Sequence, residues 1–412
     1  MLNSFQAVVI LLVISRIDNI TDAGTFVIAY AVANLLIMIG KYGIRQYQVS
    51  DVRGQFSFHE YLTLRIITTI LMIAAAFIYI LFLYMNGSYD INKSAAVLLI
   101  CGLKAVDAFE DVFHGMFQQH GRLDIAGKIL TLRLFLYIIE YMLVYYFTHD
   151  LILTSAVCLI TTLLLSIFLN GSVMKVFRQE DVSVSETSAH PQAGFFHLTF
   201  SHLKELAMDC FPLFISTFLM AYVANAPKYS IDIVLSSHDQ AQFNYIFMPV
   251  FVISLLSTFI YQPMINRLAV IWHENKLSQF WHLILRQTII IGVLTLLAMF
   301  GGYLLGIPVL SLLYAVDLSA YRTELVILLL GGGMLALVNF FTMVITVTRY
   351  QKHLIWGYLL ISIGFLIGGK EIARTFGIMG ISCFYTISMA VLTLIFLLYI
   401  IIVVRLSRNR QK

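Results

Sequence analysis

The sequence contains few charged residues. Only 12% of its 412 residues are Asp, Glu, Lys or Arg, whereas 60% are hydrophobic. An average soluble domain carries about 25% charged residues. This composition therefore excludes an ordinary soluble domain and indicates a protein whose solvent is lipid.

Cysteine is also scarce. Cys101, Cys158, Cys210 and Cys383 lie in apolar segments without paired spacing, which predicts neither a disulfide framework nor a zinc site. No cofactor or metal is expected. Segment 364–370 has the Gly and Lys spacing of a phosphate-binding loop, but Glu371 stands where Ser or Thr would bind magnesium, so ATP hydrolysis is not expected either.

Long apolar stretches separated by short polar breaks fill the chain. A transmembrane helix needs about 20 apolar residues. The sequence therefore predicts an all-α, polytopic membrane protein with about twelve transmembrane helices. Their approximate ranges are 2–16, 24–44, 61–85, 95–118, 128–147, 151–171, 205–224, 242–263, 282–305, 324–347, 353–369 and 377–404.

The distribution of cations predicts the orientation in the membrane, because Lys and Arg accumulate in cytoplasmic loops. With Met1 inside, only six of the 26 Lys and Arg residues fall outside. Both termini are therefore expected in the cytoplasm, and the net charge of +4 reflects this asymmetry rather than nucleic-acid binding. The six outer cations are Arg16, Lys93, Lys228, Arg322, Lys370 and Arg374.

The chain is expected to form two halves. A polar segment predicts a cytoplasmic linker at 172–203 between a six-helix bundle at 1–171 and a second at 204–412. Similar sequences begin the third and the ninth predicted helix, namely Tyr61–Arg65 and His282–Arg286. This similarity suggests an internal repeat, and transporters often place their substrate site at a repeat interface.

The predicted helix 95–118 carries a polar stripe. Ionisable groups are costly inside a membrane, so the stripe should face a cavity or a partner. One interpretation is a water-filled path in which Asp107 or Asp111 binds a coupling proton or cation, and the other is a structural ion pair between Lys104 and Asp107. The stripe consists of Lys104, Asp107, Glu110, Asp111, His114 and Gln118.

The next predicted helix, 128–147, places Arg133, Tyr137 and Glu140 on one face. One interpretation pairs these residues with the stripe, with Glu140 as a third candidate for ion coupling. The alternative is hydrogen bonding within the bundle without a coupling role.

Several cations are candidates for a phosphate group. Arg16 and Lys228 are the strongest candidates, because they are predicted on the outer side of the membrane, where the positive-inside rule disfavours cations. Arg45 suits a phosphate through its planar, bidentate fork, although it also obeys the rule. Lys41 is interpreted as an interfacial anchor.

A polar segment, Asn225–Tyr229, follows the predicted helix 205–224. Proline fixes the backbone and asparagine favours turns, so a turn is expected here. Such a turn would hold Lys228 at the end of the helix.

Four sets of segments carry a family resemblance, namely Asn225–Tyr229 with Asp232, Tyr42–Gln46, Gly102–Asp107 with Gln118–Arg122, and Gly306–Leu310 with Leu313, Tyr314 and Asp317. Together they resemble the Wzx-type polysaccharide flippases of the multidrug, oligosaccharidyl-lipid and polysaccharide (MOP) exporter superfamily. The resemblance implies two six-helix bundles in a V around a cationic cavity, with a substrate-binding motif at Asn225, Pro227, Tyr229 and Asp232.

The resemblance implies a transporter of polyprenyl-pyrophosphate-linked oligosaccharide in the cytoplasmic membrane, working with membrane lipid and with the glycosyltransferases and polymerase of its pathway. Arg16, Arg45 and Lys228, with Lys104, would neutralise the pyrophosphate. One alternative is an ion-coupled multidrug or cation antiporter, which predicts an acidic cavity. The other, a membrane glycosyltransferase or polymerase, would need a larger external loop, so the protein is not expected to be an enzyme.

Overall fold

Every regular element in the described part of this computed structural model is a helix. Nine helical runs are long and apolar enough to cross a membrane, as judged over the described residues. This confirms the predicted all-helical, polytopic membrane fold. The structure describes residues 2–17, 20–51, 55–184, 200–261, 264–274, 276–348 and 350–409.

Three features reconcile nine runs with the twelve predicted helices. Helix α1 (Leu2–Arg16) has only 15 residues. Helix α5 (Ile91–Gln119) carries the polar stripe, which lowers its hydropathy. The run Leu354–Arg405 contains two predicted helices and breaks at Gly377, whose φ of 59° lies in the left-handed region open to glycine.

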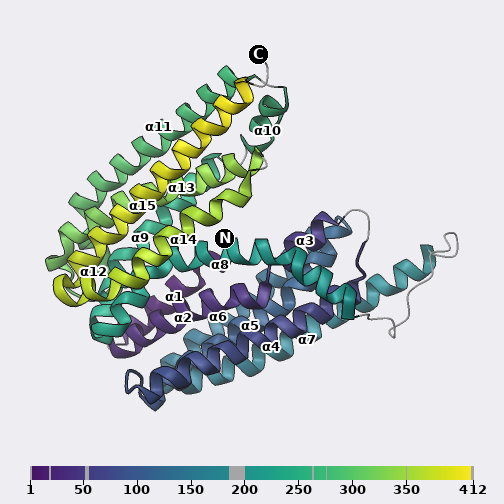
Figure 1. Ribbon diagram of the computed structural model, residues 1–412. Coiled ribbons are helices and arrows are strands. Elements are labelled where there is room, and N and C mark those ends of the chain that lie inside the picture. Colours follow the sequence, from purple (N-terminus) through teal and green to yellow (C-terminus); the bar gives the residue numbers. More distant parts are fainter. Residues whose placement is uncertain are drawn as a thin grey trace. The chain divides into compact units, whose positions relative to one another are not determined.

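The chain forms two compact units, whose helices are labelled individually in Figure 1. Unit 1 contains residues 1–18 and 25–218, and unit 2 contains residues 19–24 and 219–412. The predicted linker at 172–203 remains a prediction, because residues 185–199 lie outside the described residues.

Unit 1 is organised around α5. Figure 1 shows α4, α5, α6 and α7 running side by side, and α5 packs against the other three as well as against α3. Helix α4 exposes large apolar side chains such as Ile70 and Phe82, as expected of a surface that faces lipid. The remaining helices of this unit are α2 (Ile20–Lys41), α3 (Ile44–Ser50), α4 (Phe58–Met85), α6 (Leu123–Thr148), α7 (Leu151–Val184) and the first part of α8 (Phe200–Val234).

Unit 2 is organised around α13, which packs against α9, α11 and α15. Three consecutive glycines permit this close packing. A Cβ at Gly332 would lie 3.0 Å from the Val250 Cα, so a larger residue would force α13 away from α9. The elements are α9 (Ser237–Tyr261), α10 (Ile265–His273), α11 (Leu277–Gly301), η3 (Gly302–Gly306), α12 (Ile307–Tyr314), η4 (Ser319–Tyr321), α13 (Arg322–Val347), η5 (Gln351–His353), α14 (Leu354–Gly364), η6 (Phe365–Gly369) and α15 (Lys370–Asn409).

Helix α8 corrects one prediction. The turn expected at Asn225–Tyr229 is wrong, because α8 continues to Val234. The Asn225 amide donates a hydrogen bond to the Ala221 carbonyl, four residues earlier, at 3.3 Å. Its side chain therefore follows the helix instead of opening a turn, and Pro227 is accommodated as prolines often are in transmembrane helices. Lys228 consequently lies within the helix and not beyond its end.

Candidate functional site

The polar stripe of α5 lines a cavity in unit 1. The cavity has a volume of about 360 Å³ and is bordered by α2, α3, α5 and α6 as well as by Gln6 of α1. The prediction that the stripe faces a cavity is therefore correct for most of its members. The charged or titratable residues at the cavity wall are Lys41, Arg45, Lys104, Asp107, Glu110, Asp111, His114 and Arg133.

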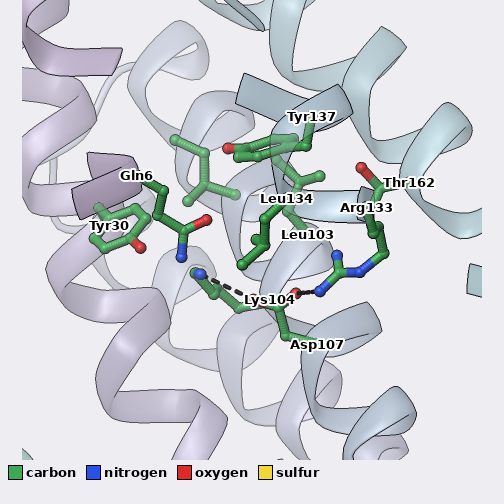
Figure 2. A pocket seen from close by; sticks show the side chains of 10 residues that line it. Gln6, Tyr30, Leu103, Lys104, Asp107, Arg133, Leu134, Tyr137 and Thr162 are labelled. Atoms are coloured by element: carbon green, nitrogen blue, oxygen red, sulfur yellow. Dashed lines mark hydrogen bonds and ion pairs between the residues drawn. The ribbon is translucent and has the colours of Figure 1, made fainter. Parts of the chain in front are cut away.

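One group of ion pairs joins α5 to α6 (Figure 2). Lys104 Nζ lies 2.9 Å from one oxygen of Asp107, which is the predicted ion pair. An Arg133 Nη2 donates to the other oxygen at 2.5 Å. Arg133 Nε also lies 2.8 Å from Glu110 Oε2, but its N–H does not point at that oxygen, so this contact is an ion pair without a hydrogen bond. Asp107 therefore has one cation on each oxygen.

The surroundings of this group are closely packed. Tyr30 lies beside Lys104, with the ammonium 4.8 Å from the ring centroid, and Figure 2 shows Gln6 on the same side. A second cavity of about 10 Å³ lies here, with room for about one water molecule. The Asn170 amide donates to Glu110 at 2.8 Å. Both carboxylates are thus held in place by several partners.

A second group of ion pairs joins α5 to α3 and α4. Arg45 Nη1 donates to Asp111 Oδ1 at 3.2 Å, and Arg65 Nη2 donates to Asp111 Oδ2 at 3.1 Å. Arg45 also donates to the Gln118 amide oxygen at 2.9 and 3.3 Å. Arg65 is fully buried and is anchored to the Gly40 carbonyl at 2.8 Å. Asp111 is therefore held between an arginine at the cavity wall and an arginine behind it.

The charges of these two groups do not cancel. Five cations surround three carboxylates, which leaves an excess of two positive charges. Among the described residues no carboxylate lies within ion-pair distance of Lys41, and the side chain of Arg45 is 30% exposed. The cations are Lys41, Arg45, Arg65, Lys104 and Arg133, and the carboxylates are Asp107, Glu110 and Asp111.

Unit 2 contains a different kind of buried cation. Lys228 is 6% exposed, and its ammonium lies 5.5 Å from the ring centroid of Phe247 and 5.4 Å from that of Phe251. No ion pair of Lys228 occurs within the described ranges of the chain. An ammonium over phenyl faces is stabilised by cation–π attraction, which replaces only part of its hydration.

Other predicted residues lie apart from the cavity. Arg16 is exposed at the end of α1 and does not border the cavity. Glu140 accepts a hydrogen bond from Thr161 at 2.6 Å, which matches the interpretation of bonding within the bundle. Tyr229 stacks on Tyr222, with ring centroids 5.6 Å apart, about two turns away along α8.

Asp232 is partly buried on the same helix as Lys228, one turn closer to its end. It belongs to unit 2, as does Asn225. The suggested substrate-binding roles of both residues, and of Pro227 and Tyr229, stay predictions.

Two cationic residues of the site escaped the sequence interpretation. Arg65 was noticed only as part of a repeated segment, and Lys41 was interpreted as an anchor. A signal existed for Arg65, because an arginine seven residues into a long apolar helix is costly unless it has a partner. For Lys41, the ends of helices in lipid carry many cations, so its position in the sequence does not separate an anchor from a cavity residue.

The chain is similar in sequence to a capsular polysaccharide biosynthesis protein, while no protein-family model matches it. The capsular polysaccharide biosynthesis protein CapF of Staphylococcus aureus is 23% identical over 327 residues, which are 78% of this chain and 76% of that protein.

Solved structures share the fold. An inward-facing multidrug resistance MATE family transporter of the MOP superfamily matches 98% of this chain and 96% of its own, with a TM-score of 0.69 and 12% identity. The lipid II flippase MurJ in an inward closed conformation matches 97% of this chain and 86% of its own, with a TM-score of 0.69 and 12% identity.

A MOP superfamily transporter from Pyrococcus furiosus matches 99% of this chain and 93% of its own, with a TM-score of 0.60 and 14% identity. The chain therefore has the fold of the MOP superfamily transporters, which MurJ shares. It is a multi-pass membrane protein of this fold.

Proposed function

We propose that this protein is a flippase for lipid-linked oligosaccharide. It would move a polyprenyl-pyrophosphate-linked oligosaccharide from the inner to the outer leaflet of the cytoplasmic membrane, by alternating access, for the synthesis of a cell-surface polysaccharide. Both termini would lie in the cytoplasm.

The observation that carries this proposal is the excess of positive charge around the cavity of unit 1. A pyrophosphate brings negative charge into a membrane protein, where its hydration is lost, so it needs cations that are not fully neutralised. No carboxylate of the described residues lies within ion-pair distance of Lys41, and Arg45 is partly exposed. Arginine offers several N–H donors to phosphate oxygens, and lysine adds a point charge.

Two similarities support the same substrate class. CapF is described as a capsular polysaccharide biosynthesis protein, and MurJ as a lipid II flippase. The first description concerns a surface polysaccharide, and the second concerns a lipid-linked substrate. Glycosyltransferases and a polymerase of the same pathway would then supply and consume the substrate.

The charge pattern favours this function over a cation antiporter. An antiporter would present carboxylates that are free to take a cation. Here Asp107 has a cation on each oxygen, and so has Asp111. A drug cation entering this cavity would therefore meet an excess of like charge.

In the proposed mechanism, the pyrophosphate is neutralised by Lys41 and Arg45, with Lys104 nearby. Lys228 of unit 2, whose ammonium lacks an ion pair within the described chain, is a separate candidate for contact with the headgroup. The membrane potential, negative inside, favours outward movement of the anionic headgroup. Arg16 stays a candidate for contact outside the cavity.

Deletion of the gene in its host tests the proposal. We expect loss of one cell-surface polysaccharide and accumulation of its lipid-linked repeat unit on the cytoplasmic face. Restored expression of the wild type should recover the polymer, whereas the double variant Lys41→Gln/Arg45→Gln should not. Lys128→Gln is a matched control, because the Lys128 side chain is 81% exposed on α6. Normal polymer from the double variant would contradict the role of the cavity.

A further inference from the structure

Asp111 and an anion bound in the cavity would compete for the same arginine, Arg45. One oxygen of Asp111 accepts a hydrogen bond from Arg45, the partly exposed arginine of the cavity wall. Arg45 Nε and Nη2 already donate to Gln118, so a phosphate oxygen would approach the Nη1 end of the guanidinium, where the negative charge of Asp111 lies. The carboxylate and the anion are therefore alternatives for one guanidinium.

The other oxygen of Asp111 has a partner that the anion cannot reach. Arg65 is fully buried, donates to this oxygen at 3.1 Å, and is fixed by its bond to the Gly40 carbonyl. Thr68 donates to the same carbonyl at 2.8 Å, which further fixes this corner. Because a buried carboxylate without a cation is costly, this second arginine matters when the first is withdrawn.

We propose that Asp111 is an internal competitor for the transported anion. It holds Arg45 until a phosphate oxygen displaces it, and Arg65 then retains the carboxylate as its counter-ion. This exchange weakens anion binding and speeds release, which a transporter requires more than tight binding. The inference rests on the proposed function, since it concerns the anion site of the same cavity.

Asp107 does not fit this role. It is bonded on both sides within the group that joins α5 to α6, and Arg133 is only 2% exposed. An anion would have to separate a buried arginine from two carboxylates to gain the same bond. Asp111 is thus the carboxylate whose exchange is least costly.

Binding of inorganic pyrophosphate to the purified protein in lipid nanodiscs tests the proposal by calorimetry. Asp111→Asn should bind at least about tenfold more tightly than the wild type, because a hydrogen bond to a charged group no longer opposes the ligand. Asp124→Asn is the matched control. Its carboxylate is 50% exposed, pairs with surface cations and lies outside the cavity, so affinity should not change.

The variant Asp111→Asn leaves Arg65 buried without a carboxylate, and this could impair folding. The double variant Asp111→Asn/Arg65→Gln removes that charge and keeps the excess around the cavity at two. It should also bind pyrophosphate more tightly, because the gain comes from releasing Arg45 and not from net charge. Adding Arg45→Gln to either variant should remove the gain.

The outcomes separate the two claims. Unchanged or weaker binding by both folded Asp111 variants, with measurable binding by the wild type, overturns the competitor role and leaves the proposed function standing. No binding by the wild type or by any variant contradicts the anion site itself, and the competitor role with it. If Asp111→Asn binds more tightly but the double variant does not, the gain comes from net charge, and this outcome also overturns the competitor role of Asp111.

Discussion

The two units of this protein accommodate buried cations in opposite ways. In unit 1, Arg65, Lys104 and Arg133 are each paired with a carboxylate on α5. In unit 2, Lys228 lies over two phenyl rings, and no ion pair of it is found in the described part of the chain. Removing Arg65, Lys104 or Arg133 therefore takes a cation away from a carboxylate, whereas removing Lys228 breaks no ion pair of the described residues. Stability and function should be separable in unit 2 and coupled in much of unit 1.

The largest effect is expected at Arg133. Arg133→Gln leaves Asp107 with Lys104 alone and removes the only cation that contacts Glu110 among the described residues, apart from His114 at 4.0 Å. Breaking a buried ion pair by removing one partner costs about 3 to 5 kcal/mol. We expect a large fall in the thermal unfolding temperature in detergent, or loss of the folded protein.

Arg122→Gln serves as the control for Arg133, because it removes a cation from an exposed pair on the same helical hairpin, with side chains about half exposed. No measurable change is expected there. Equal stability of the Arg133 and Arg122 variants would show that the cluster in unit 1 is not held by its ion pairs.

Replacing Lys228 by Met should separate the two properties. The apolar side chain fills a similar volume without the desolvation cost, so stability should rise by roughly 1 to 3 kcal/mol, as for other buried polar groups without hydrogen bonds. Polymer production should nevertheless be lost. Lys228→Arg keeps the charge and should retain part of the activity. A Met variant with normal polymer output would remove Lys228 from the mechanism.

Lys41 is the one cavity cation of unit 1 that should behave like Lys228. Lys41→Gln leaves no carboxylate unpaired, so the unfolding temperature should stay near that of the wild type. Affinity for inorganic pyrophosphate should fall roughly threefold to tenfold at low salt, and the difference should shrink as ionic strength rises. An unchanged affinity at low salt would show that Lys41 is an interfacial anchor.

Much of the fold was predictable from the sequence. The twelve apolar segments were located because a length of about 20 residues is imposed by the bilayer. The stripe on α5 was found for the same reason, since charges in lipid must face a cavity or a partner. The residues that complete the site were harder to predict, because Arg65 and Lys41 belong to other helices and their direction depends on packing.

The error at Asn225–Tyr229 has a similar origin. Asparagine and proline favour turns where water can satisfy the backbone, and this preference led to a helix end near residue 224. In lipid an open turn would leave polar backbone groups without partners, so the helix continues to Val234. The environment outweighed the local preference of two residues.

The smallest effect is expected at Tyr47, whose hydroxyl donates to Asp209 at 2.8 Å and links α3 to α8. Burial, with Asp209 adding to it, raises the pKa of Tyr47 from 10.0 to about 12. A raised pKa contributes stability that is complete below pH 10 and is lost as the pH rises through about 12. Tyr47→Phe should therefore lower stability by less than about 1 kcal/mol, equally from pH 6 to pH 9. A pH-dependent loss in that range would contradict this assignment.

Transport by the purified protein in liposomes tests the central claim most directly. The liposomes would contain a polyprenyl-pyrophosphate-linked oligosaccharide, and its appearance in the outer leaflet would be measured with a glycosidase that cannot cross the membrane. A parallel assay would follow a fluorescent drug cation under a proton or sodium gradient. We predict that the lipid-linked sugar is moved, that Lys41→Gln/Arg45→Gln abolishes this movement, and that the cation is not transported. Gradient-driven movement of the cation without movement of the lipid-linked sugar would contradict the proposed function.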